Sequence, residues 1–372
     1  MRFLFIYPNS CKFGTFHIGI GILSSILKKY GHVVDLFDTT FIPEGCEEYE
    51  FEKKVIEFKP DMLGFSVKTV DCLLAEKLYD RVAKMNIPAV VGGHHATLEP
   101  ESTAKKFGMV LRGECEIALP LLLDKFSKGE SVLDTPNLYL KKGDIFIKND
   151  LAPLFENLDE LPFPDWKLFD KRNYFESPYL DSALEGSKCL GVFEKSRGCF
   201  FSCSFCSIPK EREIYEGKGE WHREKSANRL ADEILAFKEL YPLDAIHFID
   251  DIFLSPDKNK MAEFRDVFKT RVKIHFTSSE RAERIDPDLM QMFKDTGGYQ
   301  LWIGIESGDE ELRIKMLNRR MSDETLIKAF QIAKECGVKT RATSMLGLPN
   351  QNEESYLKSY DLAGKAKPDS IQ

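Results

Sequence analysis

The chain has 372 residues, enough for two ordinary domains, and its 60 acidic and 52 basic residues give a formal net charge of −8. Both signs are spread along the chain, so it lacks the basic footprint of a nucleic-acid binder, and no apolar run reaches the length of a membrane span. Residues 1–7 read as a strand rather than a signal peptide, which predicts a cytoplasmic protein.

The first third of the chain alternates short apolar runs with amphipathic segments. The predicted strands are residues 3–7, 33–37, 62–67, 89–91 and 109–112, and the predicted helices are 20–30, 51–58, 72–84, 101–107 and 117–126. Strands that alternate with helices favour a parallel sheet covered on both faces. Right-handed crossovers then predict a doubly wound, Rossmann-like or flavodoxin-like α/β domain over residues 1–135.

Residues 136–185 have a different pattern. Two short apolar runs, 138–140 and 145–147, flank a Lys-Lys-Gly-Asp turn and predict a hairpin. Prolines stiffen the connector at residues 161–165. We interpret this stretch as a linker with a hairpin, packed between two domains.

A second alternating series occupies residues 186–372. Its predicted strands are residues 190–194, 245–249, 273–277, 299–305 and 339–346, and its predicted helices are 229–240, 258–270, 287–295, 323–336 and 356–366. The series predicts a partial (β/α)6 barrel of the TIM type. Residues 369–372 read as the opening of a sixth strand, so we expect the barrel to be truncated there.

Three of the nine cysteines form one cluster with the spacing C-x3-C-x2-C: Cys199, Cys203 and Cys206. Thiolates this close on a loop can converge on an iron–sulfur cluster. A cubane has four irons, so three cysteines leave one iron open for catalysis, as catalytic zinc sites keep one position open. The alternative is a zinc site with His222 or Cys189 as fourth ligand, which the lack of a second cysteine pair disfavours.

The triplet, with Phe205 before its last cysteine and the flanking stretches 196–198 and 208–209, resembles the cluster motif of the radical S-adenosylmethionine superfamily. The resemblance implies a [4Fe–4S] cluster whose open iron takes the amino and carboxylate groups of S-adenosylmethionine. It also implies electron transfer to the sulfonium, release of a 5′-deoxyadenosyl radical, and a place for Phe205 near the adenine.

Further motifs follow the predicted barrel strands, where the loops of a (β/α) barrel share one face. Asp-Asp-Ile-Phe stands at 250–253, Gly-Ile-Glu-Ser-Gly at 304–308 and Gly-Leu-Pro at 347–349. The family carries matching elements, which implies that these residues contact S-adenosylmethionine: Asp251, Ser279, Glu306, Ser307 and Gly347. An aspartate after a strand is often only a helix N-cap, and that alternative stays open for Asp251.

The first domain offers glycines and hydroxyl residues in the loops after its strands, at 9–19, 66–69, 92–97 and 113–114. Such loops let a large cofactor approach the backbone, but the absence of G-x-G-x-x-G argues against a dinucleotide. Stretches 19–38, 64–69, 92–100, 112–116 and 158–164 resemble the cobalamin-binding domain that precedes the radical domain in one large subfamily.

That resemblance implies a cobalamin site formed by Thr15, Gly19, Ser66, Thr69, Gly92, Gly93, His94, Thr97 and Glu114. No Asp-x-His-x-x-Gly occurs, so no histidine of that loop is expected to ligate cobalt from below. We interpret His94 and His95 as loop or substrate-side residues.

The family resemblance implies methyl transfer to an unactivated carbon or phosphorus of a small-molecule or natural-product substrate. A flavodoxin or ferredoxin would supply electrons. One alternative is radical oxidation, cyclisation or rearrangement, for example of a tetrapyrrole. Another is a non-catalytic cobalamin carrier, which leaves the cysteine triplet unexplained unless the triplet is structural.

Overall fold

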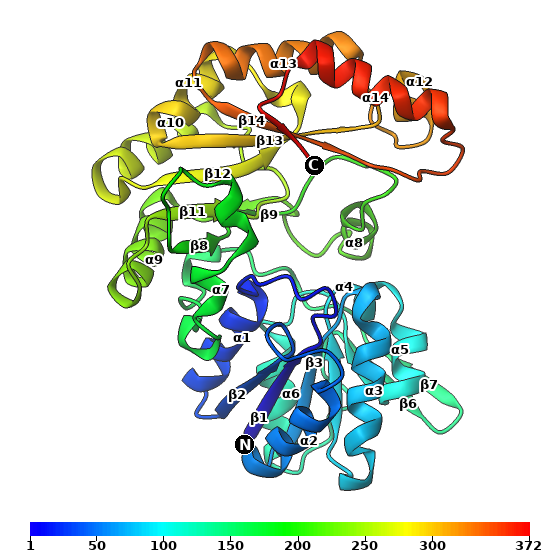
Figure 1. Cartoon of the computed structure of the whole chain (residues 1–372). Helices are drawn as coiled ribbons and strands as arrows, with labels where there is room; N and C mark the ends of the chain where they lie inside the picture. The colour runs from blue at the N-terminus through cyan, green and yellow to red at the C-terminus, as the bar shows by residue number, and fades with distance from the viewer. The chain divides into compact units, whose positions relative to one another are not determined.

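The computed structural model describes residues 1–372, which divide into two compact units (Figure 1). The N-terminal unit comprises Met1–Asn173 with Lys210–Glu220, and the C-terminal unit comprises Tyr174–Pro209 with Trp221–Gln372. The chain thus returns once to the first unit from within the segment that the sequence assigns to the second domain. No helix combines the length and the apolar character needed to cross a membrane.

The N-terminal unit is built on a sheet with strand order β2-β1-β3-β4-β5-β6-β7, of which the first five strands are parallel. These five are β1 (Arg2–Tyr7), β2 (Val33–Asp38), β3 (Met62–Ser66), β4 (Ala89–Gly92) and β5 (Met109–Leu111). The helices are α1 (Ile18–Lys29), α2 (Glu47–Phe58), α3 (Cys72–Val82), α4 (His94–Leu98), α5 (Pro100–Phe107) and α6 (Ala118–Ser127). α2 packs beside α3 and α1 beside α6, so the predicted doubly wound fold is confirmed.

The predicted hairpin joins this sheet instead of standing in a linker. β6 (Leu138–Lys142) pairs antiparallel with β5, and β7 (Ile145–Lys148) pairs antiparallel with β6. The hairpin covers the edge of β5, whose backbone groups would otherwise lack partners. The structure accordingly divides the chain after Asn173, whereas the sequence placed boundaries at residues 135 and 185.

The C-terminal unit holds a six-stranded sheet in the order β15-β14-β13-β12-β11-β8, parallel throughout. Its strands are β8 (Leu190–Phe193), β11 (Ala245–Phe248), β12 (His275–Glu280), β13 (Gly298–Glu306), β14 (Lys339–Ser344) and β15 (Ser370–Ile371). Its main helices are α9 (Ala227–Leu240), α10 (Lys258–Val267), α11 (Pro287–Thr296), α13 (Asp323–Glu335) and α14 (Glu353–Ala366). The six strands in sequential order confirm the predicted partial barrel.

Several short elements lie outside the predicted pattern. They are α7 (Arg172–Phe175), α8 (Ile208–Ile214), α12 (Glu310–Lys315), the ribbon of β9 (Ser196–Arg197) with β10 (Arg223–Glu224), and five-residue helices at Pro178–Ser182 and Phe268–Val272. The last three residues of the predicted helix 258–270 therefore fall in a π-helical turn. Short elements lack the periodicity that identifies longer ones.

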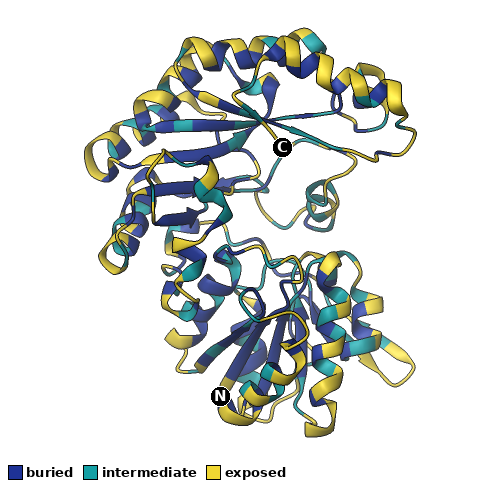
Figure 2. Cartoon of the chain, viewed as in Figure 1, coloured by how far each residue is buried: buried dark blue, intermediate teal, exposed yellow.

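The long helices gather on one face of the six-stranded sheet (Figure 1). On that face the rings of Phe248 and Phe276 lie 5.3 Å apart, and Phe276 lies 5.0 Å from Phe293 of α11. Because side chains alternate along a strand, the neighbours His247 and Thr277 point to the opposite face. Figure 2 shows the strands of both sheets as mainly buried and the outer helix faces as exposed.

Candidate active site

All strands of the six-stranded sheet point the same way, so the loops after them meet at one edge. The cysteine loop follows β8, residues 250–253 follow β11, residues 307–308 follow β13, and Gly347 follows β14. Ser279 differs from its predicted loop position, because β12 extends to Glu280 and includes it. The structure therefore brings the predicted cluster loop and the predicted S-adenosylmethionine motifs to the same edge.

Two adjacent carboxylates hold the start of the cysteine loop. Asp250 is buried and accepts hydrogen bonds from the backbone N–H of Lys195, at 3.1 Å, and from the hydroxyl of Ser196, at 2.6 Å. Asp251 Oδ2 accepts one from the N–H of Gly198, at 3.1 Å. Helix α10 is capped by Asp257 instead, so the helix N-cap alternative for Asp251 is wrong. Burial raises the pKa of Asp250 to about 7 although these hydrogen bonds favour its carboxylate.

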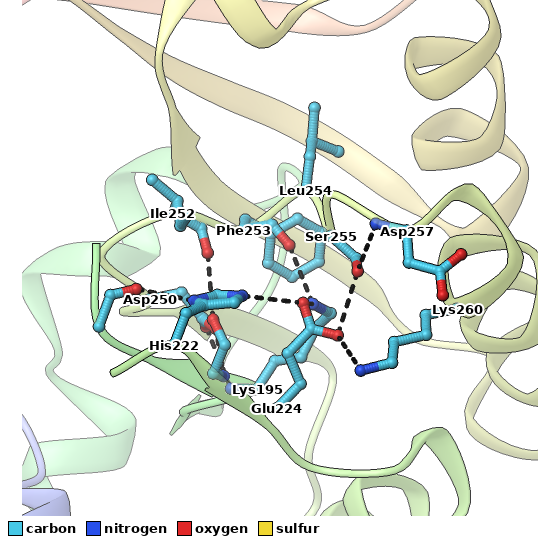
Figure 3. Close-up of polar contacts among 12 residues, drawn as sticks. Lys195, His222, Glu224, Asp250, Ile252, Phe253, Leu254, Ser255, Asp257 and Lys260 are labelled. Atoms are coloured by element: carbon cyan, nitrogen blue, oxygen red, sulfur yellow. Dashed lines mark hydrogen bonds and ion pairs between the residues drawn. The ribbon is translucent and has the colours of Figure 1, made fainter. Parts of the chain in front are cut away.

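A second contact comes from the ribbon that precedes α9 (Figure 3). His222 Nδ1 lies 2.8 Å from the carbonyl oxygen of Gly198, and its Nε2 lies 3.2 Å from Glu224 Oε1. Both partners are acceptors, so each ring nitrogen of His222 lies against an oxygen of the protein rather than facing the cysteine triplet. Trp221 Nε1 also donates to the carbonyl of Cys199, at 3.0 Å.

Glu224 is the centre of this network. Its carboxylate lies 3.4 Å from Lys195 Nζ and 3.1 Å from the hydroxyl of Ser255. Burial pushes the pKa of Glu224 upward, but the hydrogen bond from His222 and the charge of Lys195 outweigh burial and hold the pKa at about 2. The carboxylate is thus ionised and stabilises the loop that leads to the cysteines.

The three cysteines lie in different environments. Cys203 is buried, and its Sγ lies 2.7 Å from Arg281 Nη1 and 3.9 Å from Arg319 Nη1. Cys199 is partly buried, and burial raises the pKa of its thiol to about 11. Cys206 is exposed, and its N–H donates to the carbonyl of Cys203.

No group of three or more His, Cys, Asp or Glu side chains is arranged as a metal site, so the convergence of the three sulfurs stays a prediction. The surroundings nevertheless fit an anionic cluster, because two guanidinium groups face Cys203. The structure gives no support to the alternative of a zinc site with His222 or Cys189 as fourth ligand. Both ring nitrogens of His222 contact other groups of the protein. Cys189 is buried and precedes β8, whereas the triplet follows β8.

Glu306 ends β13 in a conformation that is rare for its residue type. Its φ is +61°, and the pairing register with β14 shifts between Gly304 and Glu306. A Cβ on Gly304 would lie 2.2 Å from Glu306 Oε1, so a side chain there would displace the Glu306 carboxylate. Burial raises the pKa of Glu306, and Thr343 Oγ1 lies 3.3 Å from its carboxylate. Strain of this kind is concentrated at functional sites, which supports the predicted role.

The other predicted S-adenosylmethionine residues differ in accessibility. Ser307 is fully buried; its hydroxyl accepts from the N–H of Asp309 and its carbonyl from Arg313. Phe205 is 41% exposed, so its ring is open to a ligand. Gly347 has a φ of +81° and donates its N–H to Gln351.

The N-terminal unit gathers its predicted cobalamin residues at the carboxyl edge of its parallel strands. Gly93 has a φ of +94°, and a Cβ there would lie 2.8 Å from the backbone of Val67. The hydroxyl of Thr97 donates to Gly93 O and accepts from the N–H of Gly113, each at 2.9 Å. The loops after β4 and β5 are therefore fastened to each other.

His17 lies at this edge, and sequence reasoning did not single it out. Its Nδ1 accepts from the N–H of Ile20 and caps α1, and its Nε2 lies 3.1 Å from the hydroxyl of Ser66. Burial lowers its pKa to about 4, so the ring is neutral at pH 7. A polar residue just before an apolar helical run is the signal that indicates such a cap.

Other predicted cobalamin residues have partners within the unit. His94 Nδ1 lies 2.6 Å from Glu211 Oε1, and Glu114 donates its N–H to the hydroxyl of Tyr215, also at 2.6 Å. The hydroxyl of Thr69 lies 3.2 Å from His95 Nδ1. The segment Lys210–Glu220 thus contributes to this edge, a long-range contact that no local pattern indicates.

Two buried polar atoms after β1 have no hydrogen-bond partner, Asn9 Oδ1 and Thr15 Oγ1. Gly19 follows in the first turn of α1, and Gly92 ends β4. Unpaired buried oxygens are costly in a finished core and are expected where a polar ligand completes the site. This edge therefore fits a large polar cofactor.

Comparison with protein families matches residues 193–363 to the radical SAM superfamily and residues 9–123 to the B12 binding domain. An uncharacterized methyltransferase of Pyrococcus horikoshii is 26% identical over 95% of this chain and 74% of its own length. The cytidylyl-2-hydroxyethylphosphonate methyltransferase of Streptomyces wedmorensis is 24% identical with the same shares. The anaerobic magnesium-protoporphyrin IX monomethyl ester cyclase of Rubrivivax gelatinosus is 24% identical over 99% of this chain and 66% of its length.

Two solved structures share the fold. One is the radical S-adenosylmethionine methyltransferase TsrM of Kitasatospora setae with tryptophan and an S-adenosylmethionine analogue bound; its TM-score is 0.77 at 15% identity over 100% of this chain and 72% of that chain. The other is the cobalamin-dependent radical enzyme OxsB, with a TM-score of 0.72 at 19% identity over 97% and 51%. The fold class and cofactor set predicted from the sequence are confirmed at the family level, and the chain belongs to the radical SAM superfamily with a B12 binding domain ahead of its radical SAM domain.

Proposed function

We propose that this cobalamin-dependent radical SAM enzyme transfers a methyl group to an unactivated carbon or phosphorus of a small-molecule substrate. The observation that carries the proposal is a B12 binding domain followed by a radical SAM domain whose cysteine triplet lies at the carboxyl edge of the sheet. Two of the three relatives matched by sequence above are methyltransferases, one of them acting on a phosphonate.

The cofactors are a [4Fe–4S] cluster, S-adenosylmethionine and cobalamin. When bound, the reduced cluster supplies the electron that splits S-adenosylmethionine into methionine and a 5′-deoxyadenosyl radical, and cobalamin supplies the methyl group. The residues that would hold the cluster are Cys199, Cys203 and Cys206. A flavodoxin or ferredoxin is the proposed electron donor.

The chain's own residues hold the cysteine loop in place and set a positive charge against the negative charge of a bound cluster. Asp251 and His222 fix the peptide groups around Gly198, directly before the first cysteine. Arg281 places a positive charge against Cys203, where a cluster carries negative charge. Phe205 and Glu306 remain our proposals for the adenine and for the polar groups of S-adenosylmethionine.

The N-terminal unit would hold cobalamin over the loops after its strands. Its glycines let the corrin approach the backbone, and its unpaired oxygens at Asn9 and Thr15 can accept from amide groups of the cofactor. His17 cannot serve as a cobalt ligand, since both its nitrogens are engaged.

The test begins with anaerobic reconstitution, followed by iron, sulfide and corrinoid analysis. We expect four irons and one corrinoid per chain, and turnover of labelled S-adenosylmethionine to methylated product with S-adenosylhomocysteine. A protein that binds zinc instead, or that assembles no cluster, contradicts the proposal.

A triple alanine variant provides the residue-level test. Replacing the triplet, C199A/C203A/C206A, is expected to abolish iron binding. The control replaces three cysteines outside the triplet, C11A/C46A/C336A, and is expected to retain a full cluster.

Radical cyclisation is the second candidate, favoured by the similarity to the magnesium-protoporphyrin ester cyclase over 99% of this chain. It predicts 5′-deoxyadenosine without methylated product or S-adenosylhomocysteine. A non-catalytic cobalamin carrier predicts cobalt absorption bands and no cluster absorbance. The same anaerobic assay therefore separates the three.

A further inference from the structure

The face of the six-stranded sheet opposite the helices is polar. Parallel sheets are normally covered on both faces and lined by aliphatic side chains. On β8 this face carries the aliphatic Leu190 and Val192, but over β11 to β14 the side chains that alternate with the helix-facing core include His247, Thr277, Ser279, Gln300, Trp302, Arg341 and Thr343. A polar face inside a barrel-type sheet points to a ligand rather than to packing alone.

Arg341 is the charged residue on this face and lies in β14, the strand next to the edge strand β15. It is the Cα partner of Trp302 across β13 and β14, and its guanidinium carbon lies 4.9 Å from the centre of the indole ring. Its Nε donates to the hydroxyl of Ser370, at 3.2 Å. Its terminal nitrogens have no acceptor in the protein, and no carboxylate lies within ion-pair distance. The guanidinium is thus fixed in direction while its two terminal nitrogens stay available.

The other arginines around the site are paired differently. Arg313, fully buried, donates to the carbonyls of Ser307 and Met321 and to Asp323 at 2.7 Å. Arg281 has a carboxylate partner on a nearby residue. Arg313 and Arg281 thus use their terminal nitrogens on groups of the protein, whereas the terminal nitrogens of the half-buried Arg341 have no such partner, which fits a site for an external anion.

The neighbours of Arg341 add no compensating negative charge. His247 stacks on Tyr179 with ring centres 3.8 Å apart and lies 2.6 Å from the hydroxyl of Thr277. Burial and then the charge of Arg341 lower the pKa of His247 to about 3, so the imidazole is neutral. The ring centre of Tyr179 also lies 5.9 Å from that of Trp302. The face therefore presents a positive fork beside neutral aromatic rings.

The position of Arg341 along β14 places it near the proposed S-adenosylmethionine residues. Thr343, two residues further along β14, pairs with Gly304 and contacts the carboxylate of Glu306. Two strand residues span about 6.6 Å, so the guanidinium lies one strand repeat below the level of the proposed S-adenosylmethionine residues. A ligand anchored at Arg341 can extend from there toward the edge where the cysteine loop lies.

We propose that Arg341, held against Trp302, binds an oxyanion group of the substrate, a carboxylate or a phosphoryl group, through its two terminal nitrogens. The planar fork of arginine matches both groups in a bidentate manner. The inference rests on the proposed function, because it assigns the substrate of that reaction to the polar face of this sheet.

The test measures binding of small probes to the reconstituted protein by ligand-observed NMR titration. Benzoate and benzamide have the same shape and differ in charge. Phenylphosphonate tests whether the group that binds is a phosphoryl group rather than a carboxylate. We expect R341Q to weaken benzoate or phenylphosphonate by at least about tenfold and to leave benzamide unchanged, with R341K in between. The control K339Q removes an equal charge two residues earlier on the same strand and is expected to bind as wild type does.

Three results overturn the inference. They are equal binding of benzoate by wild type and R341Q, an equal loss in R341Q and K339Q, and loss in R341Q of the change that S-adenosylmethionine causes in the cluster's EPR spectrum. The last would assign Arg341 to S-adenosylmethionine itself. Failure of the proposed function gives a different result. The wild-type protein then forms no cluster, while its preference for benzoate over benzamide still depends on Arg341. Circular dichroism of each variant verifies that it is folded.

Discussion

Asp251 accepts a hydrogen bond from the backbone N–H of Gly198, although 53 residues separate them in the sequence. The bond ties the motif after β11 to the peptide directly before the first cysteine of the triplet. An aspartate expected to contact S-adenosylmethionine therefore also positions the cluster loop. Together with His222, which contacts the carbonyl of Gly198, it fixes the peptide groups on both sides of this residue.

Gly198 is accordingly the residue whose substitution should disturb the loop most. Its φ is +90°, and a Cβ would lie 2.3 Å from the carbonyl oxygen of Trp221. We expect G198A to lose about 1–3 kcal/mol of unfolding free energy and most of its iron. The measurements are denaturant unfolding and iron per chain after reconstitution.

Gly186 provides the matched control, because its φ is +89° and nothing lies within 4 Å of a Cβ built there. G186A should share the backbone strain and retain its iron. Equal iron loss in both variants would show that the clash with Trp221 plays no part.

Arg281 should influence the reduction potential of the cluster. Its guanidinium lies 2.7 Å from Cys203 Sγ and 3.8 Å from the ring centre of Phe201. Removing a buried positive charge beside an anionic cluster disfavours the more negative, reduced state. We expect R281Q to lower the midpoint potential by tens of millivolts, measured by potentiometric EPR titration. R271Q, at an arginine paired with Asp232 on the surface, should leave the potential unchanged.

Glu306 should show a trade-off between stability and ligand binding. At a φ of +61°, glycine avoids strain that glutamate carries, so we expect E306G to raise the unfolding free energy by about 1 kcal/mol. The same change removes the carboxylate and should weaken S-adenosylmethionine binding, measured by calorimetry on the reconstituted protein.

Lys367 is the control for this prediction, with a φ of +52° at the end of α14. K367G should stabilise the protein to a similar extent and leave S-adenosylmethionine binding intact. A loss of binding in K367G, or full binding in E306G, would argue against a ligand role for Glu306.

His17 should make the stability of the N-terminal unit depend on pH. Its folded-state pKa, about 4, lies below the ordinary value of 6.5, so folding favours the neutral ring. The stability it contributes is present above pH 6.5 and is lost as the pH falls from about 6.5 toward 4. The expected loss is about 1–3 kcal/mol.

H17N tests this dependence, since asparagine caps a helix as well as histidine does but does not titrate. We expect the variant to lose less stability than wild type across the same pH range in chemical unfolding. Parallel pH profiles for the two proteins would mean that folding does not lower the pKa of His17.

Much of the fold follows from local patterns in the sequence. Strands such as 3–7 and 339–346 and helices such as 323–336 lie within a few residues of their observed bounds, because hydrophobic periodicity reflects which face each element buries. β12 is the least well predicted strand: it begins two residues and ends three residues later than expected. Its polar end, Ser278–Glu280, lacks the apolar run by which a strand is recognised.

The order of strands, by contrast, depended on contacts that no short segment specifies. The hairpin of β6 and β7 reads as a linker by itself and becomes part of a sheet only because the edge of β5 is available. The segment Lys210–Glu220 returns to the N-terminal unit through partners such as Tyr215 and Glu114, which lie 101 residues apart.

The amino-acid sequence by itself determined the two α/β domains, the cysteine triplet with its spacing, and the glycine-rich motifs after the strands, since each is encoded within a few neighbouring residues. Only the tertiary structure decided which charges meet: Arg281 with Cys203, His222 with Glu224 and Gly198, and Arg341 with Trp302 and no anion. Ion pairs and hydrogen bonds form between groups that are close in space. Those distances are set by strand pairing and packing in the folded chain, not by neighbouring positions in the sequence.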